Sequence, residues 1–202
     1  TQSRSSAASD VYKRQRKRQG LDSRWVICPT GGIDKVQSFA SLFSGKGIHM
    51  VALCDYGNGD KGKVQRLRES QIMKTSGVLV ATDFTGKAES DIEDFFAPAV
   101  FADILNGAYG LKGKGQISAR QFSQDGALTR QVKQAEALFN VMGASVPPLD
   151  HFTPANWLIQ NQHVLAAETT AINETLERFE KAFAEINAVS YTHLTLPTIY
   201  SV

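Results

Sequence analysis

The chain has 202 residues, a formal net charge of +2 at pH 7, 42% hydrophobic residues and 21% charged residues. This is ordinary globular composition, and it lacks the strongly basic field that by itself indicates nucleic-acid binding. Two cysteines and the absence of any apolar run near the roughly 18 residues of a membrane span argue against a disulfide scaffold and a membrane partner, so we expect a cytoplasmic protein.

The two ends of the chain differ from its middle. Residues 1–20 are polar and basic with no hydrophobic periodicity, which predicts a disordered or artefactual tail, with a basic nucleic-acid-binding arm as the alternative. Residues 5–15 and 190–199 resemble translated adapter or vector sequence, so residues 189–202 are expected to be an artefactual tail as well. Both ends are left out of the fold prediction.

The first predicted elements alternate between strand and helix. Trp25–Pro29 is a short apolar run that predicts a strand, and apolar residues at helical spacing predict a helix over residues 33–44, ended by the glycines of residues 45–47. Met50–Cys54 is an unbroken apolar run, which is typical of a strand covered on both faces. Each of the two predicted strands holds one cysteine, and we expect both to be small core residues.

The second strand ends on an acid and a glycine-rich loop. Asp55 follows it directly, at the edge where open α/β sheets gather their ligands. Gly57, Gly59 and Gly62 then allow positive φ and close approach of the backbone to a ligand.

The same loop has the spacing of a nucleotide-binding loop. Gly57–Lys63 matches G-x4-G-K, which would make Gly57 and Gly59 cofactor-binding residues. Val64 stands where that motif needs Ser or Thr for Mg²⁺, and Asp55 puts a negative charge where phosphates would approach. Nucleotide binding through a degenerate loop is therefore the alternative rather than the main hypothesis.

A third strand and an acidic segment follow. A mostly polar helix is predicted over residues 63–73 and a strand over residues 78–81, which implies a parallel sheet with right-handed crossovers. Asp83 and then four acids in residues 89–94 come after that strand. Acids in the first turn of a helix interact favourably with the helix dipole, which is the simple explanation for part of this cluster.

The last third of the chain is predicted to be helical. One amphipathic helix covers residues 128–142, a second begins at Thr153-Pro154 with Thr153 as its N-cap, and a third contains residues 176–186. The domains are then an α/β domain over residues 21–110 and a C-terminal helical region over residues 111–188.

The acids point to metal chemistry. Because Asp55, Asp83 and the acids of residues 89–94 all follow strands of one parallel sheet, we expect them at the same edge. Crowded carboxylates repel unless a cation lies between them, and oxygen ligands suit Mg²⁺ or Mn²⁺. Two such ions can serve phosphodiester hydrolysis. No histidine is expected in the cluster.

These segments resemble a known family. GGIDKVQSFASLF (residues 31–43), VALCDYGNGDKGK (51–63) and ESDIEDFF (89–96) are similar to the TOPRIM domain of OLD-family nucleases, in which an ABC-type ATPase domain precedes a C-terminal TOPRIM nuclease domain. HFTPANWL and TLERFEKAFAEIN are similar to the C-terminal tail of such proteins. The resemblance implies a truncated TOPRIM-like (Rossmann-like) α/β sheet that lacks its first strand, followed by a small helical segment.

The resemblance also implies an activity and a site. The activity is that of a metal-dependent DNA endonuclease or nickase, with DNA as partner; ATP use and homodimerisation would belong to the upstream part of the full-length protein. Asp55 matches the first acid of the TOPRIM Asp-x-Asp motif, and Glu93 and Asp94 match the later acidic pair. The implied metal ligands are Asp55, Asp91, Glu93 and Asp94. The implied catalytic residues are Asp55, Glu93, Lys61 and Lys63, with the lysines stabilising charge on the phosphate.

Two departures from the family pattern matter. No strand carrying a catalytic Glu precedes Trp25, and Gly57 stands where the second Asp of Asp-x-Asp belongs, which leaves Asn58 or Asp60 as substitutes. A non-catalytic regulatory or binding module with a degenerate TOPRIM fold is therefore a second hypothesis. A receiver-like phosphoacceptor domain, with Asp55 as acceptor, is a third, although the acid pair and the lysine that it needs are not visible.

Overall fold

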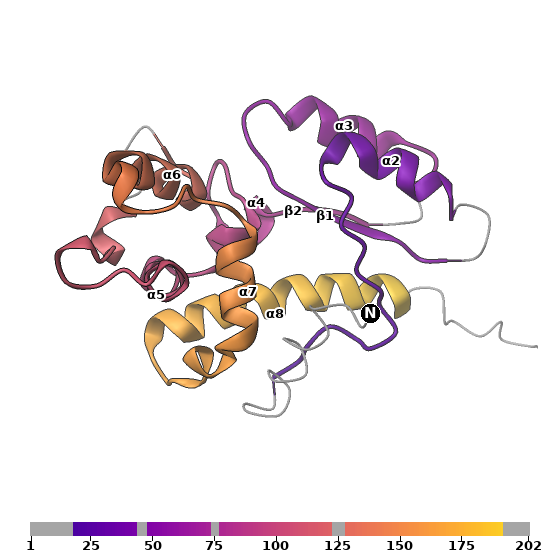
Figure 1. Ribbon diagram of the computed structural model, residues 1–202. Coiled ribbons are helices and arrows are strands. Elements are labelled where there is room, and N and C mark those ends of the chain that lie inside the picture. The colour runs from indigo at the N-terminus through magenta and orange to yellow at the C-terminus, as the bar shows by residue number, and fades with distance from the viewer. Residues whose placement is uncertain (1–17, 44–47, 74–76, 123–127, 192–202) are drawn as a thin grey trace, which may run out of the picture.

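The computed structural model describes residues 18–43, 48–73, 77–122 and 128–191. Within these ranges an α/β part comes first in the chain and a group of helices follows it (Figure 1). The α-helices and strands are α2 (Ile33–Ser41), β1 (Val51–Cys54), α3 (Lys61–Glu69), β2 (Gly77–Val80), α4 (Thr82–Thr85), α5 (Pro98–Tyr109), α6 (Gln131–Met142), α7 (Phe152–Gln160) and α8 (Thr170–Tyr191). The 3-10 helices are η1 (Ile92–Phe95), η2 (Gly113–Gly115), η3 (Ala119–Gln121), η4 (Gly143–Ser145) and η5 (Gln162–Ala166).

Two parallel strands form the described sheet, which confirms the predicted mixture of helices and parallel strands. β1 and β2 pair in register from Val51 opposite Gly77 to Cys54 opposite Val80. The strands lie between α2 and α3 on one side and α8 on the other (Figure 1). Their side chains join those of α2 and α3 in one apolar core, whose buried residues are Val36, Ala40, Cys54, Val64, Leu67, Met73 and Val80. Unbroken apolar runs therefore formed strands, as expected for strands covered on both faces.

The predicted strand at Trp25–Pro29 is wrong. This segment has no strand structure, Val26 and Ile27 are 78% and 40% exposed, and Cys28 is exposed rather than in the core. The sheet of the described residues accordingly has two strands where three were expected. An apolar run becomes a strand only where a neighbouring strand takes its hydrogen bonds, and periodicity in one segment does not show that neighbour.

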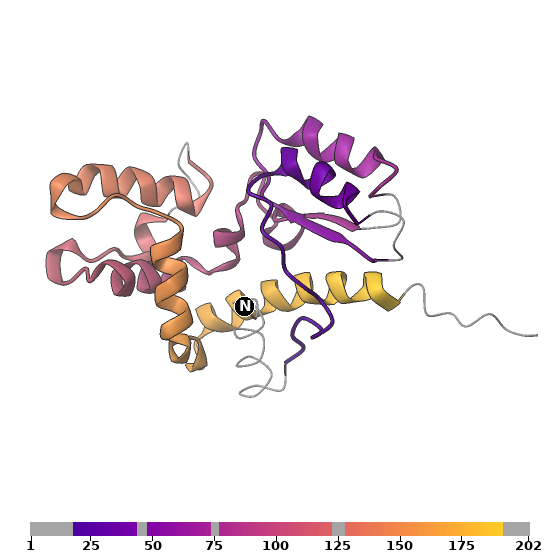
Figure 2. The ribbon, with the colours of Figure 1, turned by 45° about the vertical axis from the view of Figure 1, so that its right-hand side comes forward.

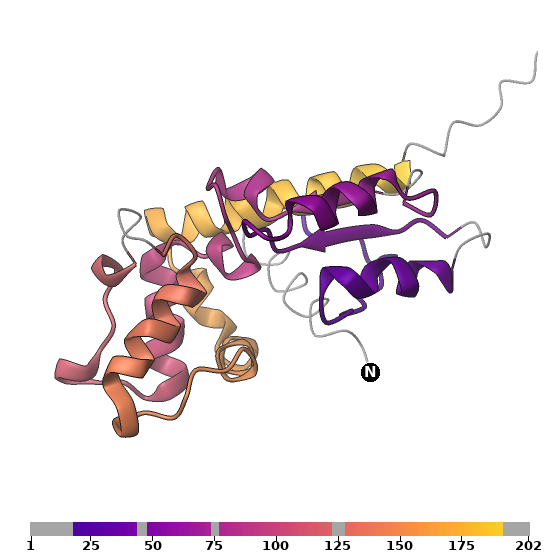
Figure 3. The same cartoon turned by 90° about the horizontal axis from the view of Figure 1, so that it is seen from above.

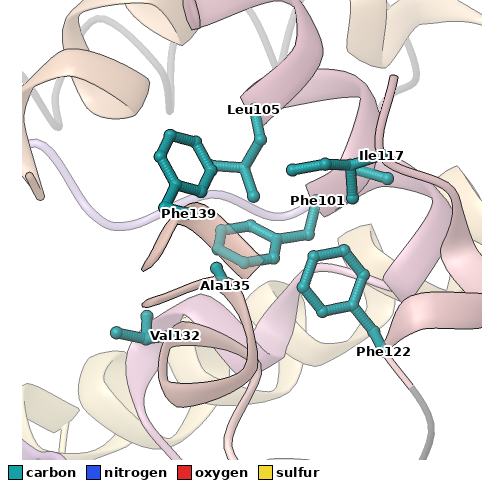
Figure 4. Close-up of a cluster of buried hydrophobic side chains, with 8 residues drawn as sticks. Phe101, Leu105, Ile117, Phe122, Val132, Ala135 and Phe139 are labelled. Carbon is teal, nitrogen blue, oxygen red and sulfur yellow. The ribbon is translucent and has the colours of Figure 1, made fainter. Parts of the chain in front are cut away.

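Helices α5 and α6 enclose a second core. Side chains from both helices and from the connection between them meet there, as Figure 4 shows for Phe101, Leu105, Ile117, Phe122, Val132, Ala135 and Phe139. The rings of Phe101 and Phe122 lie 5.4 Å apart, and Tyr109 packs edge-on against Phe139 at 4.6 Å. Asn106 holds the connection in place, because its side chain bonds both the N–H and the carbonyl of Ile117.

Helix α7 begins at Phe152, two residues before the predicted first helical residue Pro154, and its cap is a different residue. The Asp150 carboxylate accepts hydrogen bonds from the backbone N–H groups of Phe152 at 2.8 Å and Thr153 at 2.7 Å. Thr153 is therefore inside the helix, and the prediction that it is the N-cap is wrong. Asp, like Thr, is a favoured capping residue, so the sequence alone left the choice open.

Helix α8 connects the two parts of the molecule. It runs along the strands and on past α5, as Figures 2 and 3 show from two sides. Its Thr175 hydroxyl accepts the backbone N–H of Ala97 at 2.8 Å, and its Val189 side chain packs against Gly77. The predicted division into residues 21–110 and 111–188 stays a prediction. Within the described residues, none of the helices has both the length and the apolar character to cross a bilayer.

Some predictions fall on other parts of the chain. Residues 18–20, expected in the N-terminal tail, lie against α8, where Arg18 pairs with Glu180 at 2.7 Å and the Gly20 carbonyl accepts the Asn187 amide. Residues 189–191 of the predicted C-terminal tail form the end of α8. The rest of the two predicted tails, residues 1–17 and 192–202, and the predicted helix end at residues 45–47 lie outside the described residues.

Candidate functional site at the end of the parallel strands

The acidic segment is joined to the end of β1. Tyr56 and Ser90 form an antiparallel bridge, each donating its N–H to the other's carbonyl at 2.8 Å. Asp55 lies one residue before Tyr56, and its carboxylate accepts the N–H of Ile92, two residues after Ser90, at 2.9 Å. The structure therefore brings the two halves of the predicted acidic site together, at the edge of the sheet where they were expected.

The Asp55 carboxylate has little compensation for its loss of solvation and its negative charge. Although part of its side chain reaches solvent, loss of water around the carboxylate raises its pKa, and the negative charge of Glu93 raises the pKa further. The Ile92 N–H and the positive charges of Arg130 and His151 oppose this shift. Among the described residues, no basic side chain forms an ion pair with Asp55.

The raised pKa of Asp55 predicts a more stable protein when this charge is removed. When the pKa of a carboxyl is higher in the folded than in the unfolded state, the protein loses stability as the pH rises through the raised pKa. The ionised form of Asp55 therefore opposes folding at pH 7. Asp55→Asn keeps the acceptor for the Ile92 N–H, and we expect it to raise the Tm at pH 7 and to have little effect at pH 3. Thermal unfolding at both pH values measures this, with Glu136→Gln on the surface of α6 as the control. A lower Tm for Asp55→Asn at pH 7 would contradict it.

Asp91 is paired with a base from a distant segment. Arg130, which precedes α6, donates to the Asp91 carboxylate at 2.8 Å. Burial raises the pKa of Asp91 even though the Arg130 charge and hydrogen bond oppose the change. This predicted metal ligand is therefore held by a protein cation in the structure.

Asp94 is fully buried. Its carboxylate pairs with Lys87 at 2.5 Å and accepts the N–H groups of Asp91 at 2.8 Å and Gln131 at 3.1 Å. Asp91 and Asp94 thereby form a reciprocal capping box around η1. Both oxygens of Asp94 are used inside the protein, which gives this predicted ligand a structural role. The cluster thus starts a 3-10 turn ahead of α5, rather than the α-helix itself.

Glu93 lies on the solvent side of η1 and meets a histidine. His151 Nδ1 is 3.0 Å from Glu93 Oε1, and this hydrogen bond is the main cause that raises the pKa of His151. Sequence reasoning placed His151 outside the cluster. No local sequence signal indicates this contact, because His151 and Glu93 are 58 residues apart in the chain. His151 reaches Glu93 because it lies just before α7.

The glycine loop is folded around carboxylates. The Gly57 N–H donates to Asp60 at 3.0 Å, and the Asn58 N–H donates to Glu89 at 2.7 Å. A nucleotide-binding loop needs such N–H groups for phosphate oxygens. The expected positive φ is wrong for this loop, since the positive-φ glycines of the described residues lie elsewhere. The space beside Gly57 is narrow instead, because a Cβ there would lie 3.3 Å from the Asp60 carboxylate.

The two predicted lysines have different environments. Lys63 pairs with Asp34 of α2 at 2.8 Å, and this hydrogen bond raises its pKa. Lys61 is the first residue of α3 and is exposed. Asp83, expected near Asp55, caps the end of β2 by accepting the Val80 N–H and lies near Arg68.

The donor set fits a hard cation only in part. Asp55 and residues 89–93 bring four carboxylates together against the Arg130 guanidinium and the His151 imidazole. This excess of negative charge suits a divalent cation, and carboxylate oxygens are its preferred ligands. However, across the described residues no group of three or more Asp, Glu, His or Cys side chains is arranged to hold a metal ion. Among the described residues, Asp55 and Glu89 form no ion pair with a basic side chain, whereas Glu93 is paired with His151.

No protein-family model matches this sequence, and neither the curated proteins nor the solved structures provide a match. The resemblance to OLD-family TOPRIM domains stays a prediction based on the residues quoted for it. A function for the chain therefore follows from the site geometry together with that resemblance.

Proposed function

We propose that this chain is the metal-binding part of a TOPRIM-like nuclease domain that hydrolyses phosphodiester bonds of DNA, with Asp55 and Glu93 as ligands of Mg²⁺ or Mn²⁺. The observation that carries the proposal is the junction of two distant acidic segments at the carboxyl end of β1, through the Tyr56–Ser90 bridge and the bond from Ile92 to Asp55. In this junction Asp55 has a raised pKa and no ion-pair partner among the described residues.

Each residue has a defined part in this proposal. Asp55 and Glu93 hold the cation, which when bound would lower the pKa of a water molecule and polarise a phosphate oxygen. Lys61, exposed at the start of α3, is the candidate to contact the phosphate, whereas Lys63 is occupied by Asp34.

Calorimetry of the full chain with Mn²⁺ tests the proposal. We expect binding in the millimolar range or tighter, lost in the double variant Asp55→Asn/Glu93→Gln. Glu177→Gln/Glu185→Gln removes two exposed carboxylates of α8 and should bind as the unchanged protein does. Absence of binding, or equal binding by the double variant, would overturn the assignment of these ligands.

A second candidate function is a non-catalytic binding module with a degenerate TOPRIM fold. The ion pairs of Asp91 with Arg130 and of Asp94 with Lys87 favour it, because they neutralise two of the four expected ligands. A supercoiled-plasmid nicking assay in Mn²⁺ distinguishes the two: metal binding without nicking supports the module. Nucleotide binding is not favoured, since Gly57 and Asn58 donate to carboxylates.

A further inference from the structure

A cavity of about 440 Å³ lies next to the acidic site, among η1, α5, α7 and α8. Of its 18 lining residues, 15 are apolar, and they include Phe96, Ile104, Leu158, Leu176 and Phe179. Ile104 and Leu176 are almost fully buried, at 2% and 3% exposure. The volume falls in the range of about 300–1,000 Å³ that is typical of small-molecule sites, which combine apolar walls with a few polar groups.

The polar groups of the cavity are gathered together. Its three polar lining residues are Glu93, Asp150 and His151. His151 bonds Glu93 and follows Asp150 directly in the chain. The side chains of Glu93 and His151 are 30% and 67% exposed, so this rim faces solvent. The cavity thus has a buried apolar end and a polar mouth.

The charges at the mouth select the head group of a ligand. The Asp150 carboxylate is engaged within the protein, because it accepts the N–H groups of Phe152 and Thr153 and the hydroxyl groups of Thr153 and Tyr109. Glu93 uses Oε1 for His151, and its Oε2 has no hydrogen bond among the described residues. The mouth has two carboxylates, Glu93 and Asp150, and one basic side chain, His151. The nearby Asp55 carboxylate adds further negative charge next to Glu93. A positively charged group is therefore favoured over an anion.

We propose that this cavity binds a small amphiphile with one apolar tail and a positively charged amine head, the tail among the α5, α7 and α8 side chains and the head at Glu93. Burying the tail removes apolar surface from water, which supplies the affinity. The ammonium group donates to the free oxygen of Glu93, which supplies the preference for the head group. This inference does not rest on nuclease activity or on metal binding.

Octylamine, octanol and octanoate are the probes, titrated into the full chain by calorimetry in EDTA. We expect saturable one-to-one binding of octylamine, at least tenfold tighter than that of octanol, with octanoate weakest. Glu93→Gln should reduce the advantage of octylamine over octanol by about tenfold while leaving octanol binding unchanged. Because the buffer is metal-free, failure here leaves the metal proposal standing, and failure of metal binding leaves this one standing.

A blocking variant locates the ligand. Ala155 lines the cavity but is exposed on α7, so Ala155→Trp should fold normally and abolish octylamine binding. Asn156→Trp, at the next position of the same helix and outside the lining, should bind as the unchanged protein does. Leu158→Phe fills the cavity from within and should weaken binding in the same direction. Absence of octylamine binding, tighter binding of octanoate, or equal binding by Ala155→Trp would overturn the proposal.

Discussion

Asp94→Ala is expected to lower the free energy of unfolding by about 3–5 kcal/mol, the range for breaking a buried ion pair by removing one partner. Asp94 has no exposed surface, and its partner Lys87 is only 13% exposed, so the lysine would be left as an uncompensated buried charge. The substitution also removes the carboxylate that accepts the N–H groups of Asp91 and Gln131. These two hydrogen bonds connect η1 to the start of α6. Urea unfolding followed by circular dichroism measures the loss.

An exposed ion pair serves as the control. Lys133 and Glu136 lie 2.8 Å apart on α6 with side chains 43% and 38% exposed, so Glu136→Ala should cost less than about 1 kcal/mol. Lys87→Met should destabilise as Asp94→Ala does, because it leaves the Asp94 charge buried. If Asp94→Ala instead kept full stability and lost Mn²⁺ binding, Asp94 would be a metal ligand after all and its structural role would be wrong.

The sequence predicted the elements that depend on local pattern. The apolar runs of β1 and β2 and the helical spacing of α2 and α6 all produced the expected structure within a few residues. Parallel pairing followed from the alternation of strands and helices. That pairing is what brought Asp55 toward the acidic segment, so the broad location of the candidate site was predictable.

Interactions between distant segments were not predictable in the same way. Lys87, Arg130 and His151 each pair with one acid of the site, and nothing in the spacing of these residues indicates it. Neighbouring acids in a sequence repel little in the unfolded chain. In the folded protein, each carboxylate is either paired with a positive charge or disfavoured in its ionised form by the negative charges around it. The structure thus divides four similar acids into two held by bases, one shared with a histidine and Asp55 without an ion pair among the described residues.

The mouth of the cavity shows the same limit. Glu93 from η1 and His151 from the start of α7 meet there only because Asp150 caps α7 and fixes where that helix begins. Apolar residues of α5, α7 and α8 pack together in one core, which includes Ile104, Trp157 and Leu176. Which of them leave a cavity depends on the crossing of the helices, which periodicity does not specify.

Gly107→Ala is expected to destabilise the protein by about 2–3 kcal/mol through overpacking at such a crossing. Helix propensity alone predicts the opposite sign, because Ala is favoured over Gly inside a helix by about 1 kcal/mol. Packing wins here, since a Cβ on Gly107 of α5 would lie 2.5 and 2.6 Å from two ring carbons of Trp157 in α7. Thermal and urea unfolding measure the change.

The matched control is Gly62→Ala in α3, where a Cβ meets nothing within 4 Å and the backbone is helical, so that substitution should be neutral or stabilising. In a Trp157→Leu background, which removes the indole ring, Gly107→Ala should lose most of its cost, giving a coupling energy of about 1–3 kcal/mol. Equal costs with and without Trp157 would contradict the packing explanation and would mean that α5 and α7 do not cross at Gly107. His151 directly precedes α7 and Ala155 lies in it, so disturbing the contact between Gly107 and Trp157 should weaken octylamine binding together with stability.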